Sequence, residues 1–207
     1  MNEHSFIFAM HMRIRDENKQ QVIRDKALSM IVKEGLDGFS MQKLAKAAGV
    51  SPATSYIYFK DKEDLIINIW LEETRKMTEA TLKGFDPAMS FRDGLKVQWI
   101  NRAKYCIKNP EKVDFLEQLR HSALYAKCFN LVGDEFKKVM SQFVGNAIKN
   151  KELVKVPVEV YWSVAFAPLY NLVKFHISGA NIAGNKFVFS EKIMLQTLEL
   201  VLKALKP

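Results

Sequence analysis

The sequence has 207 residues, 48% of them hydrophobic and 26% charged, and these proportions exclude an extensively disordered or collagen-like chain. The length exceeds that of one typical domain and leaves room for a small unit followed by a larger one. Lysine and arginine outnumber aspartate and glutamate by 31 to 23, and the net charge of +8 fits an anionic partner such as nucleic acid. A basic protein without such a partner has the same charge balance.

The cysteine content and the N-terminus bear on the compartment. Cys106 and Cys128 are too few for a disulfide framework and suit a reducing environment, so we expect a cytoplasmic protein. The N-terminal stretch lacks the basic leader and the long apolar core of a signal peptide. The longest uncharged run, residues 160–173, is shorter than the roughly 20 residues that span a bilayer and contains Pro168. We therefore expect no membrane insertion.

Apolar spacing predicts an all-α fold. Strand signals are almost absent, while apolar residues recur at spacings of three and four through most of the chain. Residues 1–15 are expected to form an N-terminal tail, and the first helix is predicted at residues 16–34, with Gly35 as its C-terminal stop. The apolar face of this helix carries Ile23, Ala27, Met30 and Ile31.

Two short helices are predicted next. The first spans residues 41–47, and the second covers about seven residues from Pro52. Ser40 and Ser51 stand where N-terminal caps are expected, and proline at a first helical position has no N–H to leave unpaired. Gly49 lies between the two helices and ends the first of them. Residues 40–59 thus have the helix lengths, the caps and the turn residue that are typical of a helix-turn-helix. The positions where its helices cross carry Leu44, Ala45, Ala48 and Val50.

The outer side of the helix that starts at Pro52 has no core left to contact once those positions face inward. One interpretation is an ordinary helical corner with surface tyrosines. The other is a recognition helix in the major groove of DNA, with hydroxyl groups at phosphates or base edges and apolar side chains at thymine methyl groups. The side chains concerned are Pro52, Ala53, Thr54, Tyr56 and Ile57, with Lys60 and Lys62 just beyond them to meet phosphates.

The remaining helices are predicted from apolar periodicity and from breaks at glycine and proline. Asp61 is the expected cap of a fourth helix, one side of which carries Leu65, Ile66, Ile69 and Trp70. Further helices are predicted at residues 91–108, 111–124, 132–150, 157–177 and 190–206.

The last predicted helix has a narrow polar stripe and a wide apolar arc. The stripe consists of Lys192, Gln196, Glu199, Lys203 and Lys206. Because the preceding helix lacks even a clear stripe, the pair predicts a second partner, which a copy of the chain would supply in a four-helix bundle. A membrane-surface role is the weaker alternative, since the polar face is thin and mixed in sign.

The segment GFSMQKLAKAAGVSPATSYIYFKDKEDLI, residues 38–66, resembles the DNA-binding signature of TetR-family transcriptional regulators. In that signature the helix-turn-helix ends in an aromatic-rich Y-x-Y-F, followed by a lysine-containing cap of the next helix. The resemblance covers residues 20–70. It implies base contacts by Gln42, Pro52, Ala53 and Ile57, and phosphate contacts by Thr54, Tyr56, Tyr58 and Lys62. Two residues depart from the family pattern: Ala53 replaces a glycine, and Ser55 replaces a leucine that packs inward.

The resemblance also implies a domain organisation. Residues 16–62 would form the helix-turn-helix domain, with the motif at 40–59, and residues 63–207 a helical ligand-binding and dimerisation domain. Aromatic and methionine side chains in the later helices suit an apolar or aromatic effector, although core packing is the simpler interpretation for each of them. The candidate ligand-binding residues are Trp99, Cys106, Phe115, Leu119, His121, Tyr125, Phe143 and Tyr170, with His176 as a further one.

Catalytic motifs and the paired cysteine or histidine spacing of a zinc site are absent from the sequence, so we expect neither an enzyme nor a cofactor. The resemblance, together with the wide apolar arc of the last helix, implies a homodimeric repressor that binds a pseudo-palindromic double-stranded DNA operator and is released by a small apolar or aromatic effector. The alternative is a helical small-molecule-binding or scaffolding protein without DNA binding.

Overall fold

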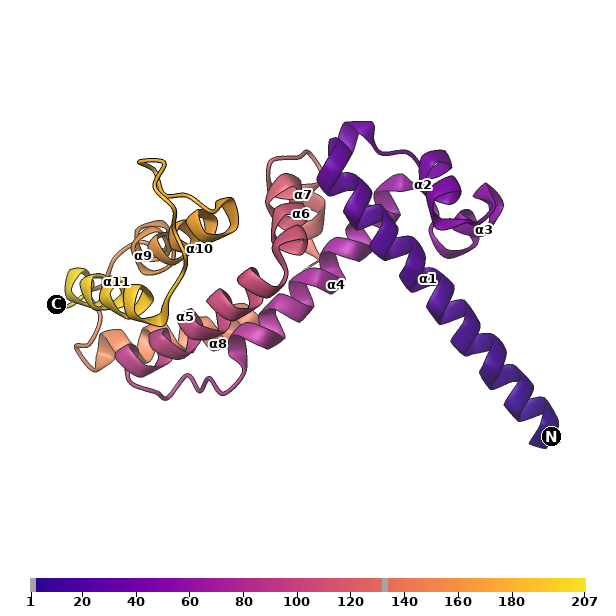
Figure 1. The fold of residues 1–207 in the computed structure, drawn as a ribbon. Coiled ribbons are helices and arrows are strands. Elements are labelled where there is room, and N and C mark those ends of the chain that lie inside the picture. Colours follow the sequence, from indigo (N-terminus) through magenta and orange to yellow (C-terminus); the bar gives the residue numbers. More distant parts are fainter. Residues whose placement is uncertain (1–2, 132–133) are drawn as a thin grey trace. The chain divides into compact units, whose positions relative to one another are not determined.

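The computed structural model describes residues 3–131 and 134–207, and this part of the chain contains eleven α-helices (Figure 1). An isolated antiparallel bridge joins Ala180 and Lys186 in the loop before the last helix. The predicted all-α fold is confirmed. None of the helices in the described residues combines the length and the apolar content that crossing a membrane requires.

The chain divides into two compact units. The first comprises the described residues of Met1–Thr74 and Glu111–Val132, and the second those of Arg75–Pro110 and Gly133–Pro207. The division falls within α4 (Lys62–Leu82), and the chain later returns to the first unit to add two more helices. The predicted boundary after residue 62 divides the chain by expected function, with DNA binding before it and ligand binding and dimerisation after it. It does not follow the compact units, and it stays a prediction.

The first unit contains the N-terminal helices, the first part of α4, and two later helices. They are α1 (Glu3–Gly38), α2 (Met41–Ala48), α3 (Pro52–Tyr58), α6 (Pro110–Arg120) and α7 (Tyr125–Asn130). The first helix begins at Glu3 rather than at residue 16, so the expected tail is helical from Glu3 on. Gly35 interrupts α1 with a left-handed φ of 75°, at the stop that the sequence predicts.

One hydrophobic core holds the helices of the first unit together. The predicted apolar face of α1 contributes to it, with Ile23, Ala27 and Ile31 fully buried. The predicted apolar side of α4 is buried in the same cluster, which also includes side chains of α6 and α7. These helices therefore support α2 and α3 from behind.

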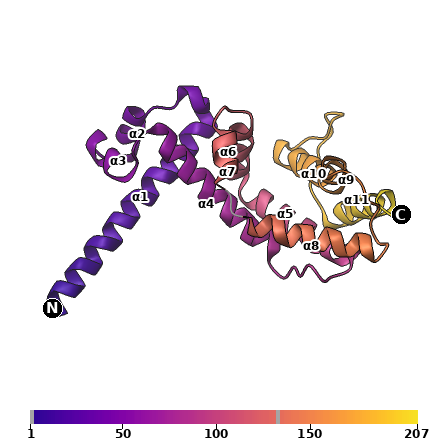
Figure 2. The ribbon, with the colours of Figure 1, turned by 180° about the vertical axis from the view of Figure 1, so that it is seen from behind.

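The second unit consists of the end of α4 and five further helices. They are α5 (Phe91–Lys108), α8 (Glu135–Lys149), α9 (Val158–Ala165), α10 (Ala167–Ser178) and α11 (Glu191–Ala204). Helix α10 packs against α5, α9 and α11, and α5 packs against α8, as the two ribbon views show (Figure 1, Figure 2).

Two of these predicted helix ranges were wrong in part, and the start of a third lies outside the described residues. The range 157–177 is divided at Phe166, whose φ of −127° leaves the helical region; Pro168, at the start of α10, has no N–H to continue a helix. The range 111–124 ends at Arg120, because the hydroxyl of Ser122 bonds the Leu119 carbonyl oxygen at 2.7 Å and closes the last turn. The expected start at Val132 lies outside the described residues, and α8 begins at Glu135.

Gly94 lies where α5 and α8 approach each other closely. A Cβ atom at this position would lie 2.7 Å from Cζ of Phe143. The Phe143 ring cannot easily move aside, since its centroid is 5.8 Å from the stacked ring of Phe91 and 5.0 Å from the edge-on ring of Phe85. Any side chain at residue 94 would therefore overpack this contact.

We expect Gly94→Ala to lower the free energy of unfolding by about 1–3 kcal/mol, the usual cost of overpacking. Gly145→Ala in α8 is the matched control, because a Cβ atom there meets nothing within 4 Å. Alanine's higher helix propensity should raise the stability of that variant by up to about 1 kcal/mol. Urea denaturation measures both changes, and an unchanged stability of Gly94→Ala would contradict the close approach.

Candidate nucleic-acid interface

The predicted helix-turn-helix is formed by α2 and α3, and both predicted caps are confirmed. The Lys43 N–H donates to Oγ of Ser40 at 3.3 Å, and the Thr54 N–H donates to Oγ of Ser51 at 3.1 Å. Gly49 adopts a left-handed φ of 67°, and its N–H donates to carbonyl oxygens at the end of α2. The turn between the helices thus rests on local contacts that the sequence specifies.

The core fixes which side of α3 faces outward. Leu44 and Ala45 of α2 are fully buried, and Ser55 and Phe59 are the buried positions of α3 and its C-cap. The opposite side of α3 is exposed, and it includes Ile57, whose side chain is 77% exposed. An apolar side chain held in solvent on a helix with firmly placed ends is typical of a docking surface.

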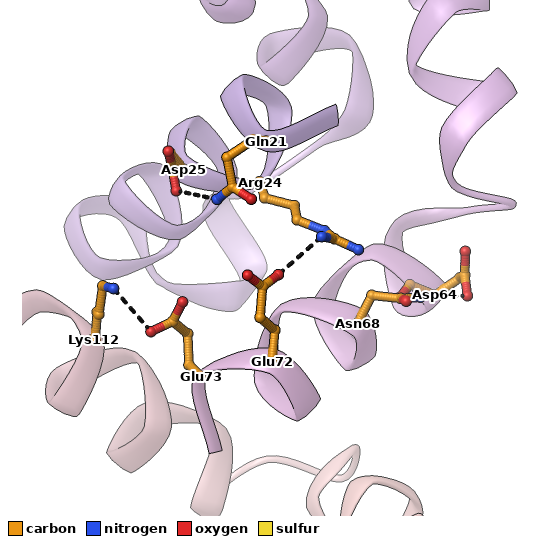
Figure 3. Close-up of polar contacts among 8 residues, drawn as sticks. All are labelled: Gln21, Arg24, Asp25, Asp64, Asn68, Glu72, Glu73 and Lys112. Atoms are coloured by element: carbon orange, nitrogen blue, oxygen red, sulfur yellow. Dashed lines mark hydrogen bonds and ion pairs between the residues drawn. The ribbon is translucent and has the colours of Figure 1, made fainter. Parts of the chain in front are cut away.

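The turn into α4 is fixed by a reciprocal cap. The Asp64 N–H donates to Oδ1 of Asp61 at 2.8 Å, and Oδ2 of Asp64 accepts the Lys60 N–H at 3.0 Å. Asn68 holds the Asp64 side chain from the next turn, with Nδ2 at 3.0 Å from Oδ1 (Figure 3). The predicted cap at Asp61 is confirmed.

The two lysines expected at phosphates have different surroundings. Lys60 is exposed, whereas Lys62 is half-buried and its Nζ donates to the Leu36 carbonyl oxygen at 2.6 Å. Nζ of Lys62 also lies 5.8 Å from the centroid of the Phe39 ring. Lys62 therefore ties the start of α4 to the end of α1, and its contact with DNA stays a prediction.

The other expected contacts lie on α2 and α3 of the same unit. Gln42, Pro52, Ala53 and Tyr56 are exposed. Oγ1 of Thr54 is 2.8 Å from Oγ of Ser51, and Tyr58 is half-buried against the core. The fold thus brings all nine expected residues onto α2, α3 and the turn into α4, while their contacts with DNA stay predictions.

Ion pairs behind the helix-turn-helix were missed by the sequence analysis. Nη1 of Arg24 lies 2.9 Å from a carboxylate oxygen of Glu72, and the Arg24 guanidinium lies 5.7 Å from the centroid of the Phe59 ring (Figure 3). Nζ of Lys112 pairs with Glu73 at 3.1 Å, which joins α6 to α4. These partners are far apart in the sequence, so no local pattern indicates them.

Ser55 occupies the position at which the family pattern has an inward leucine. Its side chain is fully buried, and its Oγ has no hydrogen-bond partner among the described residues. Removing an unpaired buried hydroxyl and gaining helix propensity should make Ser55→Ala more stable than the wild type by about 1 kcal/mol. Ser51→Ala, which loses the cap of α3, should lose about 1 kcal/mol. Denaturant titration of both variants provides the measurement, and a destabilised Ser55→Ala would contradict the unpaired hydroxyl.

Four of the candidate ligand-binding residues lie in the first unit. Phe115 and Leu119 are fully buried in its core, and Tyr125 packs edge-on against Trp70 with ring centroids 6.2 Å apart. His121 is exposed. These positions belong with the helices that support α2 and α3.

The other four candidates lie in the second unit. Trp99, Cys106 and Phe143 are buried there, and Tyr170 is half-buried. His176, the further candidate, accepts the Phe189 N–H at Nδ1 over 3.3 Å. Neither unit therefore brings the whole candidate set together, and ligand binding by these residues stays a prediction.

Buried polar groups in the second unit were missed by the sequence analysis. Gln98 and Arg102 lie one turn apart on α5 and are buried, as is Tyr161 of α9. Burial raises the pKa of the Cys106 thiol to about 11, and the positive charge of Arg102 opposes part of this shift. Burial also raises the pKa of Tyr161. The sequence feature that could have indicated these buried polar groups is the pair Gln98 and Arg102, which lie four positions apart on an otherwise apolar helix face.

Metal binding finds no support in the described part of the chain, where no three His, Cys, Asp or Glu side chains gather as a metal ion requires. Both cysteines are free and buried.

Comparison with known proteins places the first unit in a family. Residues 23–69 match the family model of bacterial regulatory proteins of the tetR family. An uncharacterized HTH-type transcriptional regulator of Haemophilus influenzae is 36% identical over 90 residues, which are 43% of this chain and 48% of that protein. The Fatty acid metabolism regulator protein of Bacillus subtilis is 38% identical over 61 residues, 30% of this chain and 31% of that protein. The chain thus matches less than half the length of these relatives.

Solved structures extend the likeness over almost the whole chain. A TetR family transcription regulator from Marinobacter aquaeolei is 26% identical with a TM-score of 0.73, over 94% of this chain and 98% of that chain. A TetR-family transcriptional regulator from Haemophilus influenzae has the same TM-score at 21% identity, over 92% and 98%, and shows the fold alone.

The sequence match and the fold define a helix-turn-helix regulator with a larger helical second unit. Residues 23–69 match the DNA-binding part of TetR-family transcriptional regulators, as the resemblance of residues 38–66 predicted. The family is non-enzymatic, in agreement with the expectation from the sequence.

Proposed function

We propose that this TetR-family regulator is a cytoplasmic homodimeric repressor, which binds a pseudo-palindromic double-stranded DNA operator and leaves it when a small apolar or aromatic effector binds. The exposed side of α3 is the observation that carries the DNA-binding part of this proposal. Its ends are capped by Ser51 and closed at Phe59, its inner side is buried, and Tyr56 and Ile57 are 51% and 77% exposed. A rigid helix that presents such side chains fits the major groove.

The proposed contacts follow from the chemistry of each group. The apolar Ile57 and Ala53 suit thymine methyl groups, and the Gln42 amide suits the edge of an adenine. The hydroxyls of Thr54, Tyr56 and Tyr58 and the Lys60 ammonium suit phosphates, which position the helix without reading the sequence. Pro52 would lie at the bases and Lys62 at a phosphate.

Titration of duplexes from the protein's own promoter region tests this function. Fluorescence anisotropy should show binding to one such duplex at least about 10³-fold tighter than to a scrambled duplex, the usual span between specific and non-specific affinity. Failure to bind any duplex from this region would favour the alternative, a helical small-molecule-binding protein without DNA binding.

The exposed apolar residues of α10 and α11 support a homodimer. Part of the wide apolar arc of α11 is covered by the chain itself, since Leu198 is only 1% exposed. Leu200 of α11 is 66% exposed and Ile177 of α10 is 47% exposed, and the two helices pack against each other. The same helix pair of a second copy would cover such residues in a symmetric interface.

Leu200→Glu should raise the dissociation constant of the dimer by about 10-fold or more, because it places an unpaired charge in the interface. Lys203→Glu, an exposed position on the polar stripe, is the matched control and should leave the dimer intact. Sedimentation equilibrium measures both. A wild-type protein that stays monomeric at micromolar concentration would contradict the proposal, whereas Leu198→Glu would be uninformative because Leu198 lies in the core.

A further inference from the structure

The interior of the second unit contains a positive charge without a carboxylate partner. The Arg102 side chain is almost fully buried. Among the described residues, Arg102 takes part in no ion pair. Its Nη1 donates to the Tyr170 hydroxyl at 2.8 Å, while Nε and Nη2 have no hydrogen-bond partner in the same part of the chain. A buried arginine with two unused donor nitrogens is unfavourable unless something else binds there.

Other unpaired polar atoms gather around Arg102. The described residues hold eight buried side-chain nitrogen and oxygen atoms without a partner, and five of them belong to Arg102, Gln98 and Tyr161. Gln98 lies one turn before Arg102, so the two side chains share a face of α5. The Phe166 ring lies near both Tyr161 and Arg102. Its centroid is 6.1 Å from the Tyr161 ring centroid and 4.7 Å from the Arg102 guanidinium carbon.

The two unused nitrogens of Arg102 are the pair that suits a carboxylate. The N–H groups of Nε and Nη2 lie on the same edge of the guanidinium plane and point the same way, so they can donate to both oxygens of one carboxylate. The bond to Tyr170 uses Nη1, so the donors on this edge are unpaired among the described residues. The rings of Trp162 and Phe166, 5.4 and 4.7 Å from the guanidinium carbon, hold the plane in place.

We propose that Arg102 binds a carboxylate of the effector through Nε and Nη2, with Gln98 and Tyr161 donating to the same group. The effector class is therefore an organic acid with an apolar or aromatic body. This inference rests on the proposed function, since it assumes that the protein responds to a small molecule. A packing role alone does not require the charge, because an apolar side chain of similar size would fill the space without an unpaired cation.

Matched pairs of an acid and its amide test the inference. We choose decanoate with decanamide and 2-naphthoate with 2-naphthamide, and measure binding to the full-length protein by calorimetry and by tryptophan fluorescence. At least one acid should bind about 10-fold or more tightly than its amide, since a hydrogen bond to a charged group is stronger than one to a neutral group. Amides that bind as tightly as the acids, or no binding of either acid, would overturn the inference.

Variants of α5 assign the acid preference to Arg102. Arg102→Met should abolish the preference, and Arg102→Lys, which keeps the charge but loses the paired N–H groups, should reduce it. Lys104→Met removes an exposed cation of the same helix and should leave the preference unchanged. A preference that survives in Arg102→Met, or one that disappears in Lys104→Met, would overturn the assignment.

The stability of the protein without added ligand gives a second, independent readout. Because Arg102→Met removes a buried charge without a partner, it should raise the unfolding temperature, as is common where a site is kept for function rather than for stability. A lowered unfolding temperature would show that Arg102 is needed for the fold itself and would count against the inference.

Operator binding separates this inference from the proposed function. An acid that binds through Arg102 but leaves operator affinity unchanged would support the site and contradict effector release. A neutral compound that releases the operator equally well from the wild type and from Arg102→Met would support the regulator and overturn the acid site.

Discussion

Operator affinity should fall by about 10³-fold or more when the salt concentration rises from about 50 to about 200 mM. A protein that neutralises several phosphates releases the counterions bound to them, so the affinity declines steeply as salt is added. In the proposed dimer, each protomer would present Lys60, Lys62 and the hydroxyls of α3 to the phosphates. Anisotropy titrations at several salt concentrations measure the slope, and affinity that does not depend on salt would contradict the proposed interface.

Two variants of the helix-turn-helix should separate phosphate contacts from base contacts. Lys60→Ala should weaken binding to specific and scrambled duplexes by similar factors and should lower the salt slope by about 1 per protomer. Ile57→Ala should weaken binding to the operator alone by about 1–3 kcal/mol, because it removes an apolar contact with a base. Lys62→Ala is a poorer test, since it also removes the bond to the Leu36 carbonyl oxygen. Equal effects of Lys60→Ala and Ile57→Ala on both duplexes would contradict this division.

The helix-turn-helix could be predicted closely because its signals are local. A serine cap accepts from an N–H group three residues on, and a glycine with positive φ ends the helix that it follows, as at Ser40, Ser51 and Gly49. The inward positions could be predicted for a related reason: once the turn is fixed, helical geometry decides which side chains meet. The outward face of α3 followed from the same geometry.

The division into compact units could not be predicted, because it depends on contacts between distant parts of the chain. Phe115 and Leu119 have the apolar spacing of any buried helix face, and nothing in that spacing shows that they join the core of α1 and α4. In the same way, the wide apolar arc of α11 does not reveal that the chain itself covers Leu198 while Leu200 stays exposed. Apolar periodicity predicts burial but not the partner.

Arg102 illustrates a different limit of sequence analysis. A charged residue within an apolar helix can be an exposed side chain, one half of an ion pair, or an unpaired buried group, and these three cases have the same sequence pattern. Only the structure shows that Arg102 is buried, that one of its nitrogens donates a hydrogen bond to the Tyr170 hydroxyl, and that the other two nitrogens are unpaired among the described residues. The chemical class of the proposed effector follows from that third observation and not from the aromatic residues on which the sequence analysis relied.

Effector and operator should weaken each other's binding by the same factor, in the range of about 5- to 150-fold. The two recognition helices of a dimer must match about one turn of DNA, ~34 Å, so a ligand that favours another spacing must oppose operator binding. Thermodynamic linkage then requires the operator to oppose that ligand equally.

A compound first identified by a raised unfolding temperature can be titrated with and without saturating operator, with the fluorescence of the buried Trp99 as the signal. A scrambled duplex is the control and should leave the affinity for the compound unchanged. If the compound binds equally well in the presence and absence of the operator, its site is not the switch, because coupling in one direction without the other is thermodynamically impossible.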